Sequence, residues 1–367
     1  MIPFLNLRQL NSKYDTAFKN AYRDVLDSGY YILGKQVSLF EHNYASYCQA
    51  EHCIGTGNGL DALTLILKGY MSLGKLSKGD EVIVASNTYI ATILAVKLAG
   101  LTPILVEPDI NTFNLDSRLI KNSLTRNTKV VLMTHLYGQL CDVNAIRSIC
   151  DNHQLILIDD CAQSHGARLN SKLISGNLCD ASAHSFYPTK NLGALGDAGA
   201  VTTNDNTLAE RIKSLRNYGF NERYVADYEG VNSRLDDVQA SILNIKLKFL
   251  DEDNASRQHI AKRYVTEIQN EAIILPLYDN SQCHVFHLFV VRVANRTAFS
   301  TYLKNNAIGY NIHYPVAPHK QQALQELSKL SFPISEKIHD EVISLPCHPM
   351  LTDTEVSTII NVVNAYK

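Results

Sequence analysis

Short apolar segments alternate with helical patterns between residues 81 and 201, and this alternation restricts the fold more than any other feature. Five segments are predicted to be strands: 81–85, 103–106, 129–134, 155–158 and 200–203. Helices are predicted between them, over 90–98, 116–123 and 143–152. Continuous apolar strands that alternate with helices are typical of a mainly parallel sheet covered on both faces. We therefore predict an α/β fold.

The chain is long enough for two domains. It has 367 residues, of which 46% are hydrophobic, and a single core rarely grows beyond about 250–300 residues. Helices are predicted near 17–28 and 37–48, and long helices over 204–262 are interrupted by a loop at 218–230. A smaller α+β region follows, with a strand at 285–293 and helices at 296–306 and 356–366. We predict a large domain over 1–245, with an N-terminal helical segment, and a small domain over 246–367.

A glycine-rich loop leads into a predicted helix after Gly55. Asn58 or Gly59 is the expected N-cap, and Leu60 begins the apolar helical pattern. A helix start of this kind offers free N–H groups to an anion, typically a phosphate. An ordinary capped helix remains an alternative. The loop is not a dinucleotide fingerprint, because Leu60 stands where G-x-G-x-x-G requires its third glycine.

A carboxylate and a lysine are the other candidate site residues near the predicted sheet. Asp160 lies at the end of a predicted strand, where sites in parallel sheets form. Lys190 lies in a loop between Pro188 and Gly193, where regular helix is unfavourable and the backbone has unusual freedom. A surface lysine in a turn is the alternative interpretation of Lys190. Asp159, the neighbouring residue, is the alternative to Asp160 as the carboxylate of such a site.

Together, these features match the requirements of one cofactor. Pyridoxal phosphate needs a phosphate cradle, a carboxylate beside its pyridine nitrogen and a lysine amine for its aldehyde. The start of the helix after Asn58 would supply the cradle, Asp160 the carboxylate and Lys190 the amine. Tyr89, which follows the first predicted strand, is placed to cover the open face of a flat ring.

Nearly the whole chain resembles the DegT/DnrJ/EryC1 family of sugar aminotransferases, which are fold type I pyridoxal phosphate enzymes. The motifs that carry the resemblance are Ile2-Pro-Phe-Leu, Ser28-Gly-Tyr-Tyr-Ile-Leu-Gly, Gly57-Asn-Gly-Leu-Asp-Ala-Leu, Asp160-Cys-Ala-Gln-Ser-His-Gly-Ala, Ser185-Phe-Tyr-Pro-Thr-Lys-Asn-Leu-Gly, Leu215-Arg-Asn-Tyr-Gly, Asn232-Ser-Arg-Leu-Asp and His313-Tyr-Pro with His319.

The resemblance implies a role for several positions. Lys190 would bind the cofactor and move a proton between it and the donor carbon, Asp160 would pair with the ring nitrogen, and Gln163 would lie near the phenolic oxygen. The implied phosphate contacts are Ser185, the backbone at Gly59 and Leu60, and Asn232 from the second subunit of a homodimer. Leu60 departs from the family's usual threonine or serine, so only its amide remains.

Within the family, Ile2-Pro-Phe-Leu and His313-Tyr-Pro resemble the branch that acts on dTDP-3-keto-6-deoxyhexoses. This implies transfer of an amino group from L-glutamate to C3, giving a 3-amino-3,6-dideoxyhexose of galacto or gluco configuration for O-antigen, other surface polysaccharide or a related glycan. The residues implied to contact the sugar nucleotide are Tyr31, Tyr187, Arg223, His313 and Tyr314. The chain holds 19 tyrosines, so a structural role is the alternative for each tyrosine.

Three other functions are alternatives on the same scaffold. One is amination of a 4-keto sugar nucleotide. Another is sugar 3-dehydration, but such relatives replace the lysine with histidine, and Lys190 is present. The third is a non-catalytic regulatory or binding protein, which the retained Lys190, Asp160 and Gln163 argue against.

Charge and cysteine content narrow the possible partners and the compartment. The formal net charge is -2 and the basic residues are scattered, which argues against nucleic-acid or membrane-surface binding. No signal-peptide pattern begins the sequence. The eight cysteines and the histidines His135, His165 and His184 show no zinc-ligand spacing. We therefore predict a cytoplasmic protein with reduced cysteines and no metal.

Overall fold

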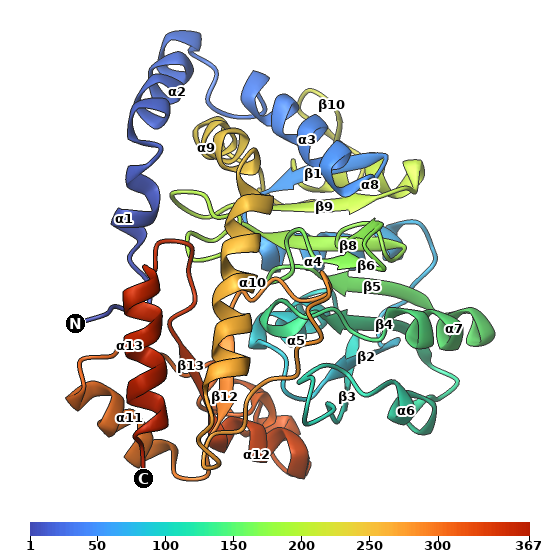
Figure 1. Ribbon diagram of the computed structural model, residues 1–367. Helices are drawn as coiled ribbons and strands as arrows, with labels where there is room; N and C mark the ends of the chain where they lie inside the picture. The colour runs from blue at the N-terminus through green and yellow to red at the C-terminus, as the bar shows by residue number, and fades with distance from the viewer.

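The computed structural model describes residues 1–367, and a seven-stranded sheet lies at its centre (Figure 1). The strand order is β1-β9-β8-β5-β4-β2-β3. Their bounds are β1 His52–Thr56, β2 Glu81–Ala85, β3 Thr102–Val106, β4 Thr128–Thr134, β5 Ile156–Asp160, β8 Ala181–Ser185 and β9 Gly199–Thr203. Strand β9 runs antiparallel to both of its neighbours, whereas the other pairings are parallel. The predicted mainly parallel α/β fold is confirmed.

The structure adds to this sheet two strands that the sequence pattern did not indicate. Strand β1 includes Gly55, which was assigned to the glycine-rich loop, and β8 is made of small and polar residues. Both strands are almost wholly buried, and the polar side chains of β8 have partners. His184 of β8, for example, contacts the hydroxyls of Tyr44 and Thr202 at 3.0 and 2.9 Å. Local hydrophobicity therefore understates how central these strands are.

Helices cover both faces of the sheet (Figure 1). On one face, α4 Gly59–Ser72, α5 Ile90–Leu98 and α8 Asn206–Leu215 contribute to the largest apolar core. On the other face, α6 Ser117–Ile120 and α7 Val143–His153 contribute to a second core, and α3 Lys35–Cys48 and α9 Asp237–Leu247 to a third. The N-terminal helices are α1 Leu7–Ser12 and α2 Asp15–Ser28.

The C-terminal part of the chain has a core of its own. Its elements are α10 Leu250–Glu267, β12 Phe289–Arg292, α11 Arg296–Asn305, α12 Pro333–Glu341, β13 Val342–Leu345 and α13 Asp353–Asn364. Strand β12 is shorter than the predicted strand because the Val285 and Leu288 amides bond to the carbonyls of Gly138 and Tyr137 instead. The division into domains at residue 246 remains a prediction.

The first residues of the chain join this C-terminal part. The Ile2 amide donates to the carbonyl of Ala307, the Gly309 amide donates to the carbonyl of Ile2, and the Ile2 side chain packs against the C-terminal core. The N-terminal segment therefore lies beside residues more than half a chain away, as Figure 1 shows.

The remaining elements are short. They are β6 Arg168–Leu169, β7 Leu173–Ile174, β10 Phe220–Glu222 and β11 Val225–Ala226, with 3-10 turns at Lys121–Ser123, Leu136–Gly138, Pro318–Lys320 and Gln322–Leu327. None of the helices combines the length and apolar character that a membrane span requires.

Candidate active site

The loop that carries Lys190 is held in a fixed shape. It follows β8, and the Lys190 amide donates a 2.8 Å hydrogen bond to the carbonyl of Tyr187. A side chain at Gly193 would place its Cβ 2.5 Å from the carbonyl oxygen of Pro188, so only glycine permits this close turn. From α9, the buried Lys246 ammonium donates a 2.6 Å hydrogen bond to the carbonyl of Gly193. The loop is therefore held by a hydrogen bond of its own backbone and by a hydrogen bond from α9.

Lys190 is partly buried, and the charge that acts on its amine is that of Asp160. Burial lowers the pKa of Lys190 to about 8, although the negative charge of Asp160 acts in the opposite direction. A lysine with so low a pKa is partly neutral near pH 7–8, which makes it able to attack a carbonyl and to carry a proton.

Asp160 ends β5, with only 6% of its surface exposed, and its charge interacts with that of Lys190. Its Oδ2 atom accepts a 2.9 Å hydrogen bond from the Thr92 hydroxyl, and its Oδ1 atom accepts a 3.1 Å bond from the Ala162 amide. Burial nevertheless raises the pKa of Asp160. A cation beside this carboxylate would offset the cost of burying its charge.

Asp159 points away from Lys190, to the other face of the sheet, as the alternation of side chains along a strand requires. It is fully buried and contacts His135 Nε2 at 3.2 Å. Side-chain atoms of Asp159, His135 and Cys161 lie within 4.8 Å of one another. However, His135 Nδ1 accepts a hydrogen bond from the Cys141 amide, so both ring nitrogens are engaged. The contacts of Asp159 and His135 are therefore those of a buried structural pair.

The start of α4 lies against the end of β8. Asn58 is the N-cap and accepts a 2.9 Å bond from the Asp61 amide. The amides of Gly59 and Leu60 have no acceptor within the chain. A Cβ on Gly59 would lie 2.6 Å from the Cβ of Ser185, so the glycine allows the helix to reach the Ser185 side chain. Two free amides and a hydroxyl at a helix start form a site for an anion.

Gln163 links Tyr137 to Tyr314, and the Tyr314 ring packs beside Tyr89. Gln163 Oε1 accepts a 2.7 Å bond from the Tyr137 amide, and Nε2 donates to the Tyr314 hydroxyl at 3.2 Å. The ring of Tyr314 lies 5.0 Å from that of Tyr89, which immediately precedes α5. Both tyrosines line a cavity of about 540 Å³.

His313 and Tyr187 also belong to this region. His313 is held by Ser344 at 2.8 Å and by Asn311 at 3.2 Å. Burial and the nearby Lys190 charge lower the pKa of His313 to about 4, so the ring is neutral near pH 7. The Tyr187 side chain is half exposed beside the lysine loop.

Three of the predicted site residues make no contact with Lys190 within the single chain. Tyr31 lies next to the start of α9, where its carbonyl accepts a bond from the Asp237 amide. Arg223 is exposed at the turn between β10 and β11 and contacts Tyr224. Asn232 is exposed, and its side chain makes no hydrogen bond within the chain.

The sequence analysis missed Thr92, Tyr137 and Lys246. Thr92 lies three residues after Tyr89, so helical spacing was a usable signal for it. Tyr137 and Lys246 carried no such signal, because their contacts with Gln163 and Gly193 depend on the fold.

The arrangement fits pyridoxal phosphate. The partly neutral amine of Lys190 suits the aldehyde, the buried carboxylate of Asp160 suits a protonated ring nitrogen, and the free amides at Gly59 and Leu60 suit the phosphate. Each of these three groups lacks a full partner within the chain, and one bound cofactor of this chemistry would satisfy all three.

Comparison with known proteins identifies the family that the sequence motifs resemble. The DegT/DnrJ/EryC1/StrS aminotransferase family profile matches residues 12–364. The chain is 53% identical over 366 residues to the dTDP-3-amino-3,6-dideoxy-alpha-D-galactopyranose transaminase of Aneurinibacillus thermoaerophilus, covering 100% of this chain and 99% of that protein. It is 39% identical over 368 residues to the dTDP-3-amino-3,4,6-trideoxy-alpha-D-glucose transaminase of Streptomyces venezuelae, covering 100% and 96%.

Solved structures agree with these matches. The crystal structure of S. venezuelae DesV superimposes with a TM-score of 0.94 at 40% identity, covering 99% of this chain and 97% of that chain. NtdA from Bacillus subtilis, solved with bound cofactor PMP, gives a TM-score of 0.90 at 31% identity, covering 99% and 84%.

Proposed function

The chain belongs to the DegT/DnrJ/EryC1/StrS aminotransferase family, and we propose that it transfers an amino group from L-glutamate to C3 of a dTDP-3-keto-6-deoxyhexose, with pyridoxal 5'-phosphate as cofactor. The product is a dTDP-3-amino-3,6-dideoxyhexose, used for O-antigen, other surface polysaccharide or a related glycan. The observation that carries the aminotransferase activity is the Lys190 amine, whose pKa is lowered to about 8 and which faces the buried carboxylate of Asp160.

The substrate class is supported by the similarity to named transaminases. The relative at 53% identity is named for a dTDP-3-amino-3,6-dideoxy sugar, and the one at 39% for a dTDP-3-amino-3,4,6-trideoxy sugar. Both names place the amino group at C3 of a dTDP-linked sugar. The higher identity favours a substrate that keeps its C4 oxygen.

Each part of the site would have a task in this reaction. When bound, the cofactor would supply an aldehyde for the amino group and a ring that accepts an electron pair. Lys190 would carry the proton at the donor carbon, and Asp160 would stabilise a positive ring nitrogen. The amides of Gly59 and Leu60 and the Ser185 hydroxyl would hold the phosphate. Tyr89 would cover the ring, and Gln163 would contact its phenolic oxygen.

The protein acts as a homodimer with shared sites. Tyr31, Arg223 and Asn232 are exposed and have no contact with Lys190 in their own chain. Exposed apolar side chains accompany two of them in the sequence: Tyr30 and Ile32 flank Tyr31, and Tyr224 and Val225 follow Arg223. Exposed apolar side chains beside polar ones are typical of an interface. In the dimer, Asn232 reaches the phosphate, and Tyr31 and Arg223 reach the sugar nucleotide, of the partner's site.

Mixing two inactive variants tests the shared site. Lys190→Ala and Asn232→Ala are purified separately, unfolded together and refolded as a mixture. A mixed dimer contains one site with both residues intact, so activity returns on mixing. No recovery, in a mixture that light scattering shows to be dimeric, would place both residues in the same chain's site and contradict the shared arrangement.

The reaction itself is tested with separate keto-sugar nucleotides. The purified enzyme is first converted to its amino form with L-glutamate, and the return of the cofactor's original absorbance is then followed with each sugar. We expect return with a dTDP-3-keto-6-deoxyhexose and none with a 4-keto sugar nucleotide. Return with the 4-keto compound alone would establish the alternative 4-aminotransferase. Lys190→Ala is the control and should stop both half-reactions while leaving the fold intact.

The cytoplasm is the compartment that suits this function. All eight cysteines are free thiols in the structure, and most are buried. Reduced cysteines persist where the cell keeps thiols reduced.

A further inference from the structure

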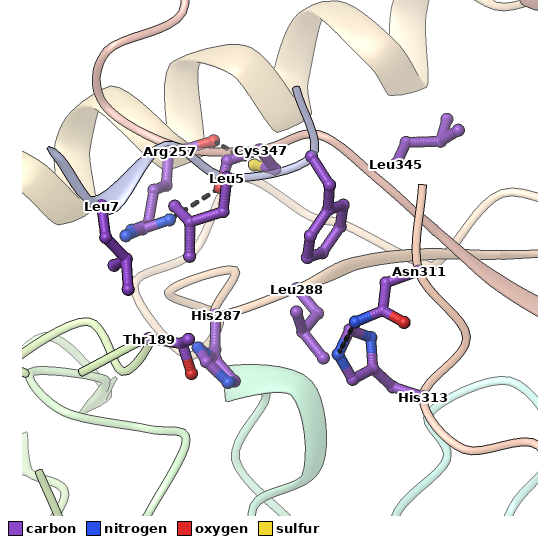
Figure 2. Close-up of a pocket in the computed structure, with 11 residues that line it drawn as sticks. Leu5, Leu7, Thr189, Arg257, His287, Leu288, Asn311, His313, Leu345 and Cys347 are labelled. Atoms are coloured by element: carbon purple, nitrogen blue, oxygen red, sulfur yellow. Dashed lines mark hydrogen bonds between the residues drawn. The ribbon is translucent and has the colours of Figure 1, made fainter. Parts of the chain in front are cut away.

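A small cavity lies beside the lysine loop, between the N-terminal segment and the C-terminal part of the chain (Figure 2). Its volume is about 210 Å³. The polar side chains that line it are Thr189, Arg257, His287, Asn311 and His313, and no acidic side chain is among its lining residues. Leucines of the N-terminal segment form an apolar wall next to Arg257 (Figure 2). The cavity therefore offers positive charge and hydrogen-bond donors without a counter-ion.

Arg257 is the charged group of this cavity. It projects from α10 into the space above Thr189 and His287 (Figure 2), and only 3% of its surface is exposed. Its Nη1 atom donates a 2.7 Å hydrogen bond to the carbonyl of Cys347, and its buried Nε atom has no acceptor. No carboxylate lies within ion-pair distance of Arg257. The charge of the buried Asp253 acts on it, but Asp253 forms its ion pair with Lys13, at 2.6 Å.

A buried arginine stays protonated at any physiological pH. Burying a charge without a partner is unfavourable, and proteins rarely retain such a group without a use. The missing partner of Arg257 is an anion, and the planar guanidinium matches a carboxylate or a phosphate group. The cofactor phosphate is already accounted for at the start of α4.

His287 lines the cavity together with Arg257, and its Nδ1 atom lies 3.3 Å from Oδ1 of Asn191, the residue after Lys190. Burial lowers the pKa of His287, and the charges of both Lys190 and Arg257 contribute to the decrease. Thr189, the residue before Lys190, also lines the cavity. The residues on both sides of Lys190 therefore adjoin the cavity into which Arg257 projects. A ligand that extends from Arg257 to the lysine loop would carry an anion at one end and its reacting group at the other.

We propose that this cavity binds the amino donor and that Arg257 holds the side-chain carboxylate of L-glutamate, while the donor's amino group faces Lys190. This inference rests on the proposed aminotransferase function. A dicarboxylate satisfies the geometry because its two ends are separated by a short flexible chain. The volume is below the roughly 300–1,000 Å³ of pockets that bind drug-sized molecules, so an amino acid fits better than a whole sugar nucleotide.

Binding of a non-reacting dicarboxylate to the holoenzyme tests the proposal directly. Glutarate has the two carboxylates of glutamate but no amine. We expect calorimetry to show glutarate binding to the wild type, and the affinity to fall about 10- to 100-fold in Arg257→Met, since a charged hydrogen-bonded pair is lost. Arg257→Lys should fall between the two, because it keeps the charge but loses the bidentate geometry.

Arg296→Met is the matched control. Arg296 is partly buried and, like Arg257, donates to a backbone carbonyl, that of His339, but it does not line the cavity. Its glutarate affinity should equal that of the wild type. If Arg257→Met does not fold, the comparison of Arg257→Lys with Arg296→Met decides the question.

A kinetic experiment separates donor recognition from a general loss of function. Conversion of the holoenzyme to its amino form is measured with L-glutamate and with L-alanine, which lacks the second carboxylate. In Arg257→Met the KM for glutamate should rise about 10- to 100-fold, the rate with alanine should stay unchanged, and the reverse half-reaction from the amino-sugar product should be unaffected.

Several outcomes would overturn the proposal. They are equal losses with glutamate and alanine, unchanged glutarate affinity in Arg257→Met, and binding of inorganic diphosphate, but not glutarate, that depends on Arg257. The glutarate and glutamate measurements use no sugar nucleotide. A wrong sugar assignment would therefore leave them intact, whereas a wild type that accepts no glutamate would refute this inference.

Discussion

The Lys246 ammonium donates a 2.6 Å hydrogen bond to the backbone carbonyl of Gly193, three residues after Lys190. Lys246 is buried in α9, and burial lowers its pKa to about 8. It also contacts Asn11 of α1 at 3.3 Å. One side chain thus connects the loop that carries the reactive lysine to two helices that are remote in sequence.

We predict that Lys246→Met loosens this loop without unfolding the protein. Loss of the hydrogen bond is offset by removal of a buried charge, so the free energy of unfolding should change by no more than about 1 kcal/mol. Retention of the cofactor during dialysis should fall about 10-fold, since a charge-assisted contact to the loop is lost. The exposed Lys248→Met is the control. Unchanged retention in Lys246→Met would show that the contact does not position the loop.

The lowered pKa of Lys190 predicts how cofactor incorporation depends on pH. Burial lowers that pKa from 10.5 to about 8, and only the neutral amine attacks an aldehyde. The rate at which cofactor-free protein takes up pyridoxal phosphate covalently should therefore rise with pH, reach half its maximum near pH 8 and level off above it. A midpoint near 10.5 would mean that the amine is exposed. Lys190→Ala should show no covalent uptake.

Asp160→Asn and Asp159→Asn should fail in different ways. The first keeps the shape of the side chain but removes the charge that faces Lys190, so turnover should fall at least about 100-fold while the fold and phosphate binding persist. The second weakens the buried contact with His135 and should lower the free energy of unfolding by about 1–3 kcal/mol. Thermal unfolding and turnover, measured on both variants, check the assignment. The reverse pattern would make Asp159 the ring partner.

Thr92→Val should act through Asp160. The variant removes the 2.9 Å hydrogen bond that favours the ionised carboxylate, so the pKa of Asp160 should rise further. The acid limb of the pH–rate profile should then move to higher pH, because Asp160 becomes protonated at a less acidic pH. Turnover at neutral pH should fall about 10-fold or more. Thr92→Ser, which keeps the hydroxyl, should retain the wild-type profile, and an identical shift in both variants would exclude the hydrogen bond as the cause.

The regular part of the fold could be predicted from local sequence. Strand β2 and helix α5 have the predicted bounds, because continuous apolar runs identify buried parallel strands and periodic ones identify helices. Strand β8 escaped prediction because its small and polar residues lack that pattern. They are stable in the centre of the sheet only because neighbouring elements satisfy their hydrogen bonds.

By itself, the sequence identified the groups to which the proposed function assigns the chemistry: a lysine in a glycine-flanked loop, a carboxylate at a strand end and a glycine-rich helix start. Each is a local pattern whose conformation depends on a few adjacent residues. Only the tertiary structure decided which side chains support them. Thr92, Lys246 and Arg257 are far in sequence from the residues that they contact. Their burial and charge interactions exist only after the sheet, the helices and the C-terminal core have packed together.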